Sequence, residues 1–128
     1  MTTYQKISVI GGGAWGTALA AMAARAERDV LLWAREGDVV TSINETHETR
    51  DFLPGVRLPA TVTAHQDLAD MAAGDIILMV APAQFVRAVA TELKQFIRES
   101  TPIILCAKGI EQASGKLMSE VASEVLPK

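Results

Sequence analysis

Cysteine is nearly absent from this sequence, with one residue, Cys106, among 128. A single cysteine excludes an internal disulfide framework and a cysteine-rich zinc site, and it suits a reducing compartment. Positive charge is not in excess either, because the net charge is −3 and the isoelectric point is about 5.3. The sequence therefore offers no basic field that would attract nucleic acid or an anionic membrane surface.

Long hydrophobic runs are also missing. The most apolar stretches, 18–24 and 76–83, are much shorter than the roughly 18 residues needed to cross a bilayer. No apolar stretch typical of a secretory signal precedes residue 7. These absences predict a cytoplasmic protein without membrane insertion. The composition, 49% hydrophobic and 21% charged, is typical of a globular chain, and the length predicts one domain spanning 1–128.

Short apolar runs alternate with helix-length segments along the whole chain. Four near-continuous runs predict strands buried on both faces of a parallel sheet, at 7–10, 30–33, 76–80 and 103–106, with a weaker candidate at 61–63. The segments between them have a period near 3.6 and predict helices, whose apolar faces include Trp15, Leu19, Met22, Phe85, Val86, Val89, Leu93 and Phe96. This order predicts an α/β fold with a doubly wound, mostly parallel sheet, helices on both faces and strand order 3-2-1-4-5.

Two local features separate some of these predicted helices and strands. Gly74 follows the segment 68–73 directly, where a glycine typically forms a left-handed helix cap, and the next strand begins at once. The stretch 46–60 is polar and contains Pro54-Gly55 and Pro59, which predicts an ordered surface excursion between the second helix and the third strand.

A glycine-rich loop follows the first predicted strand. Gly11, Gly13 and Gly16 form the pattern G-x-G-x-x-G at the start of the first helix. In a dinucleotide-binding loop the first glycine permits the tight turn, the second lets the backbone approach a pyrophosphate, and the third lets the helix lie close to the strand. The N–H groups of the helix start then face the pyrophosphate. The loop predicts a Rossmann-type fold, and a glycine turn made only for close packing is the alternative.

The end of the second predicted strand bears on the choice of cofactor. An acidic side chain at this position binds a ribose 2′-hydroxyl. The sequence instead has Arg35, 19 positions after Gly16, and Glu36 follows it. A guanidinium can pair with a 2′-phosphate and stack on adenine. We therefore expect NADP(H) to be preferred, with NAD(H) kept open by Glu36; a solvated arginine is the alternative.

Lys108 follows the last predicted strand, at the edge of an open α/β sheet where ligands bind. Its ammonium group could polarise a ketone oxygen and hold a phosphate, although an ordinary surface lysine remains the alternative. Cys106 has no histidine near it in the sequence and is interpreted as a buried, inert thiol. The sequence also has an acidic cluster with one histidine, at Glu45, His47, Glu48 and Asp51. The spacing of these residues matches no metal motif, and His65 has no evident partner, so no metal site is expected.

Five segments occur in an order that resembles one family. They are GGGAWGTALA at 11–20, LLWAR at 31–35, FLPGVRLP at 52–59, VAPAQF at 80–85 and CAKGIE at 106–111. Over essentially all 128 residues, the sequence resembles the amino-terminal domain of the bacterial NAD(P)-dependent glycerol-3-phosphate dehydrogenases. The loop containing Trp15 and the Lys108-Gly109 motif are more specific to this family than G-x-G-x-x-G alone.

The resemblance implies hydride transfer between dihydroxyacetone phosphate and sn-glycerol 3-phosphate with NAD(P)H, an oxidoreductase reaction that feeds phospholipid synthesis. It also implies that Ala14, Trp15 and Arg35 contact the cofactor. By the same resemblance, Phe85 lies beside the nicotinamide half of the cofactor, and Lys108 contacts both cofactor and substrate.

Members of that family are longer than this chain, and a carboxy-terminal helical domain supplies their catalytic lysine and substrate-phosphate pocket. We therefore expect these 128 residues to form the cofactor-binding domain of a larger enzyme, to contain no acid/base residue and to be inactive alone. The sequence leaves a homodimer open. Alternatives are a non-catalytic dinucleotide-binding or redox-sensing module, or the cofactor domain of another two-domain dehydrogenase, such as a nucleotide-sugar or phosphogluconate enzyme.

Overall fold

The computed structural model describes residues 5–11, 13–47, 57–98, 100–106 and 109–125. The described elements, including two short 3-10 helices labelled η, are β1 (Lys6–Ile10), α1 (Ala14–Arg25), β2 (Asp29–Trp33), α2 (Gly37–Thr46), β3 (Val62–His65), η1 (Leu68–Ala73), β4 (Ile76–Met79), η2 (Ala83–Phe85), α3 (Val86–Leu93), β5 (Ile103–Leu105) and α4 (Met118–Val125). In the described part of the chain, no helix is long and apolar enough to cross a membrane.

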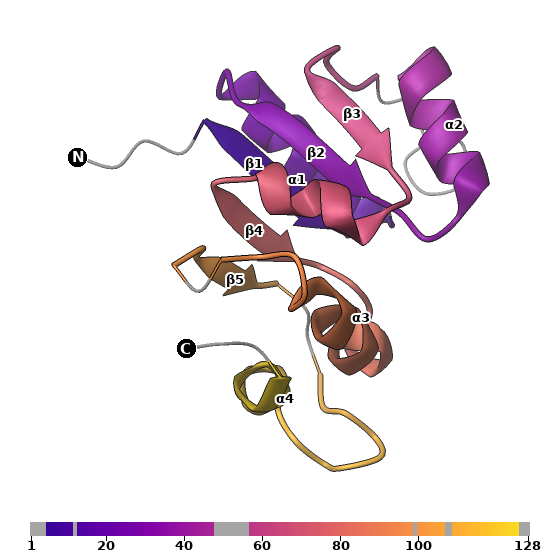
Figure 1. Ribbon diagram of the computed structural model, residues 1–128. Helices are drawn as coiled ribbons and strands as arrows, with labels where there is room; N and C mark the ends of the chain where they lie inside the picture. Colours follow the sequence, from indigo (N-terminus) through magenta and orange to yellow (C-terminus); the bar gives the residue numbers. More distant parts are fainter. Residues whose placement is uncertain (1–4, 12, 48–56, 99, 107–108, 126–128) are drawn as a thin grey trace.

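The strands form one parallel sheet in the order β3-β2-β1-β4-β5 (Figure 1). β1 lies at the centre, where Ile7 is in register with Val30 of β2 and with Ile76 of β4. The predicted α/β fold and strand order are therefore confirmed. The parallel arrangement follows from the helical crossovers, since a strand can return parallel to its neighbour only after such a connection.

Two apolar layers cover the sheet. One layer contains residues of α1 and α2 packed on the strands, among them Ala20, Ala21, Ala24, Val39 and Ile43. The other contains residues of η1, α3 and α4, among them Leu68, Met71, Val89, Leu93 and Val121. Figure 1 shows α3 and α4 side by side at the β5 end of the sheet, where these helices contact each other. Met71, Met79 and Met118 are buried in this second layer.

The buried face of α1 differs from the predicted one. Trp15 is 56% exposed and Met22 is 63% exposed, although hydrophobic periodicity places both inward. The buried positions are instead the small residues Gly16, Thr17, Ala20, Ala21 and Ala24. The reason is the close approach of the helix to β1, because a Cβ on Gly16 would lie 1.8 Å from the carbonyl oxygen of Gly11. Only small side chains fit between such closely packed elements.

Gly74 does not form the predicted left-handed cap. Its φ is −72° and its ψ is 146°, which is extended backbone that any residue can adopt. Glycine is required here for space, because a Cβ would lie 2.1 Å from Oγ of Ser8 on β1. That buried hydroxyl donates a hydrogen bond of 2.7 Å to the carbonyl of Met71. η1 therefore lies directly against the central strand.

The carboxyl-terminal part of the sheet is less buried than predicted. β5 pairs with β4 and ends the described sheet, so Ile104 is 47% exposed instead of being covered on both faces. α3 ends at Leu93, and Phe96, predicted on its apolar face, is 41% exposed. Of the predicted excursion at 46–60, the segment 48–56 lies outside the described residues.

Candidate functional site

A cavity of about 380 Å³ opens at the carboxyl edge of the sheet, around the ends of β1, β2 and β4. Ligands of open α/β sheets bind at this edge. The cavity is lined by Gly11, Gly13, Ala14, Trp15, Gly16, Trp33, Arg35, Glu36, Val80, Ala81, Pro82, Phe85 and Val89. The structure thus brings together most of the residues that the sequence analysis selected. Lys108 and Gly12 lie outside the described residues.

The three glycines of the loop have separate structural roles. Gly11 has a φ of +131°, a conformation that favours glycine, and its N–H donates to the carbonyl of Trp33 at 2.9 Å. Gly16 permits the close packing of α1 on this turn. Gly13 has an ordinary φ of −74°, and a Cβ there would have no described atom within 4 Å. The first and third glycines therefore shape the loop, whereas the second leaves space beside it.

The start of α1 is suited to an anion. The N–H of Thr17 donates to the carbonyl of Gly13 at 2.9 Å, the first bond of the helix. The preceding N–H groups of a helix have no intrahelical acceptor, and the helix dipole places a partial positive charge there. Gly13 has no side chain to cap them, and residues 14–17 are uncharged. Backbone donors are thus available to a phosphate group at the wall of the cavity.

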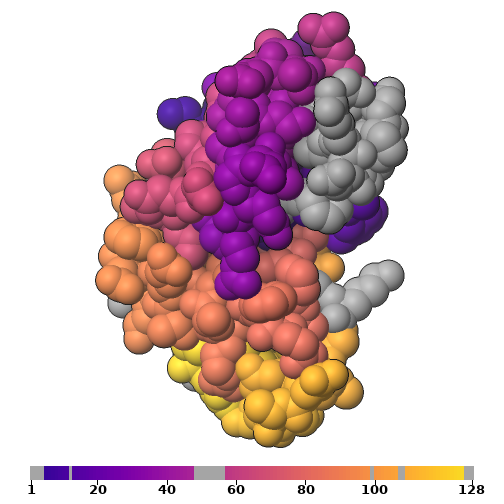
Figure 2. All heavy atoms as spheres, turned by 90° about the vertical axis from the view of Figure 1, so that its right-hand side faces the viewer, coloured from indigo at the N-terminus to yellow at the C-terminus, as the bar shows by residue number. Residues whose placement is uncertain are grey.

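Arg35 and Phe85 meet across the cavity. Cζ of Arg35 lies 4.5 Å from the centroid of the Phe85 ring, within the range of a cation–π contact. On the face shown in Figure 2, the purple surface of the β2–α2 segment meets the salmon surface of the η2–α3 segment. Phe85 is 42% exposed and Arg35 is also exposed, so both groups can contact a ligand. The arginine supplies positive charge and the ring supplies an apolar face.

Gln66 fixes the backbone that carries Arg35, a role that the sequence analysis missed. The side-chain amide of Gln66 donates to the carbonyl of Arg35 at 3.1 Å, and the main-chain carbonyl of Gln66 accepts from Nε1 of Trp33 at 2.9 Å. Gly37 lies beside Gln66, and a Cβ there would be 3.5 Å from its amide. Sequence patterns do not indicate this role, because Gln66 and Arg35 are 31 positions apart and meet only through β2–β3 pairing.

Three other candidate groups contribute no described residue to the lining of the cavity. Cys106 is partly buried, and this burial raises the pKa of its thiol, which disfavours the reactive thiolate. The expectation that His65 has no partner is wrong, because Nδ1 lies 3.1 Å from the Asp70 carboxylate and Nε2 lies 2.9 Å from Oγ1 of Thr63. Of the acidic residues around His47, Glu48 and Asp51 are outside the described residues.

The residues that line the cavity fit a dinucleotide. Backbone donors at a helix start suit a pyrophosphate, the guanidinium suits an additional phosphate, and Trp15, Val80, Pro82 and Phe85 provide apolar surface for flat rings. The space beside Gly13 would allow a phosphate to approach the backbone closely. Comparisons with known proteins identify the family in which this site occurs.

Residues 6–128 match the family model described as NAD-dependent glycerol-3-phosphate dehydrogenase N-terminus. The chain belongs to this family. A glycerol-3-phosphate dehydrogenase [NAD(P)+] of Caulobacter vibrioides is 53% identical over 125 residues, which are 98% of this chain and 38% of that protein. The chain thus spans well under half the length of these curated relatives.

Solved structures of glycerol-3-phosphate dehydrogenases have the same fold. The enzyme of Coxiella burnetii superimposes with a TM-score of 0.90 at 33% identity, covering 98% of this chain and 38% of that one. The enzyme of Saccharomyces cerevisiae superimposes with a TM-score of 0.82 at 31% identity, covering 97% and 40%. The resemblance noted in the sequence is therefore confirmed, both for the NAD(P)-binding part of this family and for the Rossmann-type fold.

Proposed function

We propose that this chain is the cofactor-binding part of an enzyme that interconverts dihydroxyacetone phosphate and sn-glycerol 3-phosphate by hydride transfer with NAD(P)H. The observation that carries the proposal is the cavity at the start of α1. The glycine loop opens into it, and Arg35 and Phe85 line it together. Membership of the dehydrogenase family supports the choice of substrate.

The proposed cofactor-binding residues are Gly11, Gly13, Ala14, Trp15, Gly16, Arg35, Phe85 and Lys108. The bound nicotinamide would supply or accept the hydride. The residues of the chain would hold the cofactor, with the start of α1 at the pyrophosphate and Phe85 beside the nicotinamide half. Arg35 would hold a 2′-phosphate, which makes NADP(H) the preferred cofactor and leaves NAD(H) as a weaker one.

Lys108 is proposed to bind the substrate as well as the cofactor. Its ammonium could stabilise the substrate oxygen that gains negative charge as hydride arrives. Lys108→Ala should then lower kcat about 10²- to 10³-fold, the scale for removal of one preorganised donor. A role limited to ground-state binding would instead raise KM with kcat nearly unchanged. Lys108→Arg, which keeps the charge but changes the shape of the group, should also be impaired.

The acid/base lysine and the pocket for the substrate phosphate are proposed to lie in a carboxy-terminal domain outside these 128 residues. The product would serve phospholipid synthesis in the cytoplasm, and a homodimer is compatible with this assignment. The test is NADPH oxidation by the full-length enzyme with dihydroxyacetone phosphate. Substrate-dependent oxidation is expected. NADPH binding without it would favour a non-catalytic dinucleotide-binding module, and activity on a different carbonyl substrate would favour another two-domain dehydrogenase.

A further inference from the structure

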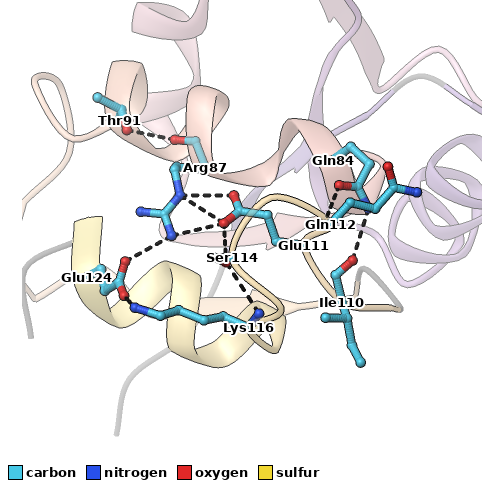
Figure 3. A network of polar contacts seen from close by, with 9 residues as sticks. All are labelled: Gln84, Arg87, Thr91, Ile110, Glu111, Gln112, Ser114, Lys116 and Glu124. Atoms are coloured by element: carbon cyan, nitrogen blue, oxygen red, sulfur yellow. Dashed lines mark hydrogen bonds and ion pairs between the residues drawn. The ribbon is translucent and has the colours of Figure 1, made fainter.

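Gln84 of η2 holds a segment that follows β5. Its side-chain Nε2 donates to the carbonyl of Ile110 at 3.0 Å, and its Oε1 accepts from the N–H of Gln112 at 2.9 Å. Figure 3 shows this amide directed at the backbone of residues 110–112. The side chain of Gln84 thereby donates one hydrogen bond and accepts another, with residues 26 and 28 positions later in the sequence. A two-point contact fixes both position and direction.

A partly buried ion pair holds the same segment from α3. The Arg87 guanidinium donates to both carboxylate oxygens of Glu111, with Nε–Oε2 at 2.9 Å and Nη2–Oε1 at 3.1 Å. Ser114 Oγ donates to the same carboxylate, and Nη2 of Arg87 lies 2.9 Å from Glu124 of α4 (Figure 3). The Glu111 side chain is only 9% exposed. These bonds to the carboxylate, first of all those from Arg87, hold the pKa of Glu111 below its usual value.

The turn that makes these contacts also forms a wall of the cavity. Gln84 lies between Ala83 and Phe85 in η2. Phe85 lines the cavity and contacts Arg35. On the other side of the turn, Gly109 has a φ of +112°, and a Cβ there would lie 3.5 Å from Cβ of Ala83. Residues 109–112 are therefore fixed to the same turn that presents Phe85 to the cavity.

We propose that Gln84 is a positioning residue for the substrate site, supported by the Arg87–Glu111 pair. It fixes residues 109–112, which directly follow Lys108 in the sequence, relative to the cavity wall at Phe85. The inference rests on the proposed function, in which Lys108 binds the substrate. Placement matters because a displacement of about 1 Å at a reacting group can cost about 10²-fold in rate.

The test is steady-state kinetics of the full-length enzyme with dihydroxyacetone phosphate and NADPH. Gln84 is exposed, so Gln84→Ala should fold normally, which thermal unfolding checks. We expect kcat/KM for dihydroxyacetone phosphate to fall about tenfold, because the ion pair still holds part of the segment. The Kd for NADPH should rise by a smaller factor than kcat/KM falls, because Lys108 is only one of the proposed cofactor contacts. Gln95→Ala, the same change at an exposed glutamine just past α3, is the matched control and should behave as wild type.

The decisive readout is a double-mutant cycle with Lys108→Ala. If Gln84 acts through Lys108, Gln84→Ala should have no further effect on kcat/KM once Lys108 is replaced. Two effects that multiply would overturn the proposal, as would wild-type kinetics in Gln84→Ala. Arg87→Lys, which keeps the charge but not the two-point contact with Glu111, should give a smaller decrease of the same kind. An inactive wild-type enzyme would refute the proposed function itself, whereas an active one insensitive to Gln84→Ala would refute only the positioning role.

Discussion

Replacement of Gly16 by alanine tests both the packing of α1 and the site that it forms. A Cβ at this position would lie 1.8 Å from the carbonyl oxygen of Gly11 and 2.9 Å from its carbonyl carbon. Both contacts are with backbone, so no side-chain rotation can relieve them. To reach 3.0 Å, the shortest separation that Cβ atoms ordinarily show, the start of the helix must move by about 1.2 Å, the difference between the two distances.

Two consequences of this displacement can be measured in the 128-residue chain. Overpacking of a close contact costs about 1–3 kcal/mol, and we expect about 3 kcal/mol here because backbone meets backbone. With an m-value of about 2 kcal/mol/M, the midpoint of urea unfolding should fall by about 1.5 M. The N–H groups at the helix start would also be displaced, so NADPH affinity, measured by fluorescence titration, should fall more than tenfold.

Gly13→Ala is the matched control, because it separates stability from binding. The φ of Gly13 is −74° and its Cβ would meet no described atom within 4 Å, so the free energy of unfolding should change by less than about 0.5 kcal/mol. The added methyl would nevertheless occupy space at the proposed pyrophosphate position and weaken NADPH binding at least tenfold. A wild-type urea midpoint in Gly16→Ala would refute the packing argument, and wild-type NADPH affinity in Gly13→Ala would refute the assignment of the pyrophosphate.

Three further outcomes are expected. Arg35→Ala should weaken NADPH binding by about 10- to 150-fold, the equivalent of a charge-assisted contact of about 1.5–3 kcal/mol, and NADH binding much less; equal losses in parallel titrations would exclude a contact with the 2′-phosphate. Glu111 has a lowered pKa, so its ion pair contributes stability above the ordinary glutamate pKa that is lost as pH falls through the lowered value. The difference in urea midpoint between wild type and Glu111→Gln should therefore be larger at pH 7 than at pH 3. An equal difference at both pH values would contradict a stabilising ion pair at Glu111. The 128-residue chain should bind NADPH without reducing dihydroxyacetone phosphate, and turnover above a heat-inactivated control would place catalysis within these residues.

The topology was predictable because it depends on features that are local in the sequence. Buried parallel strands are nearly uniform apolar runs, and the crossovers between them restrict the strand order. The structure agrees closely at β1 and β2, whose predicted bounds 7–10 and 30–33 became Lys6–Ile10 and Asp29–Trp33. The glycine loop was equally recognisable, because each of its glycines has a fixed offset from the strand end.

Contacts between distant residues were not predictable in the same way. Gln84, Arg87 and Glu111 appear in the sequence as ordinary polar residues of helices and turns, and their pairing requires the crossover between β4 and β5. Gly74 shows the same limitation. Its position after a helical segment suggested a conformational role, whereas the structure requires a glycine because Ser8, 66 positions earlier, occupies the space of a side chain.

Two of the apolar residues that were wrongly placed, Trp15 and Phe85, lie at the functional site, whereas Met22 and Phe96 do not line the cavity. Periodicity assigns Trp15 and Phe85 to the core, yet they are 56% and 42% exposed, and both line the cavity. An apolar side chain at a binding site has the same hydrophobicity as one in the core, so a periodicity argument cannot distinguish them. Adjacent small residues provide the distinction, because Gly16, Ala20 and Ala24 are sufficient to pack α1 on the sheet and leave Trp15 available to a ligand. A large aromatic residue next to a stripe of small buried residues at a helix start is therefore better interpreted as part of a binding surface. Trp15→Ala tests this interpretation. We expect it to weaken NADPH binding and to leave the midpoint of urea unfolding unchanged.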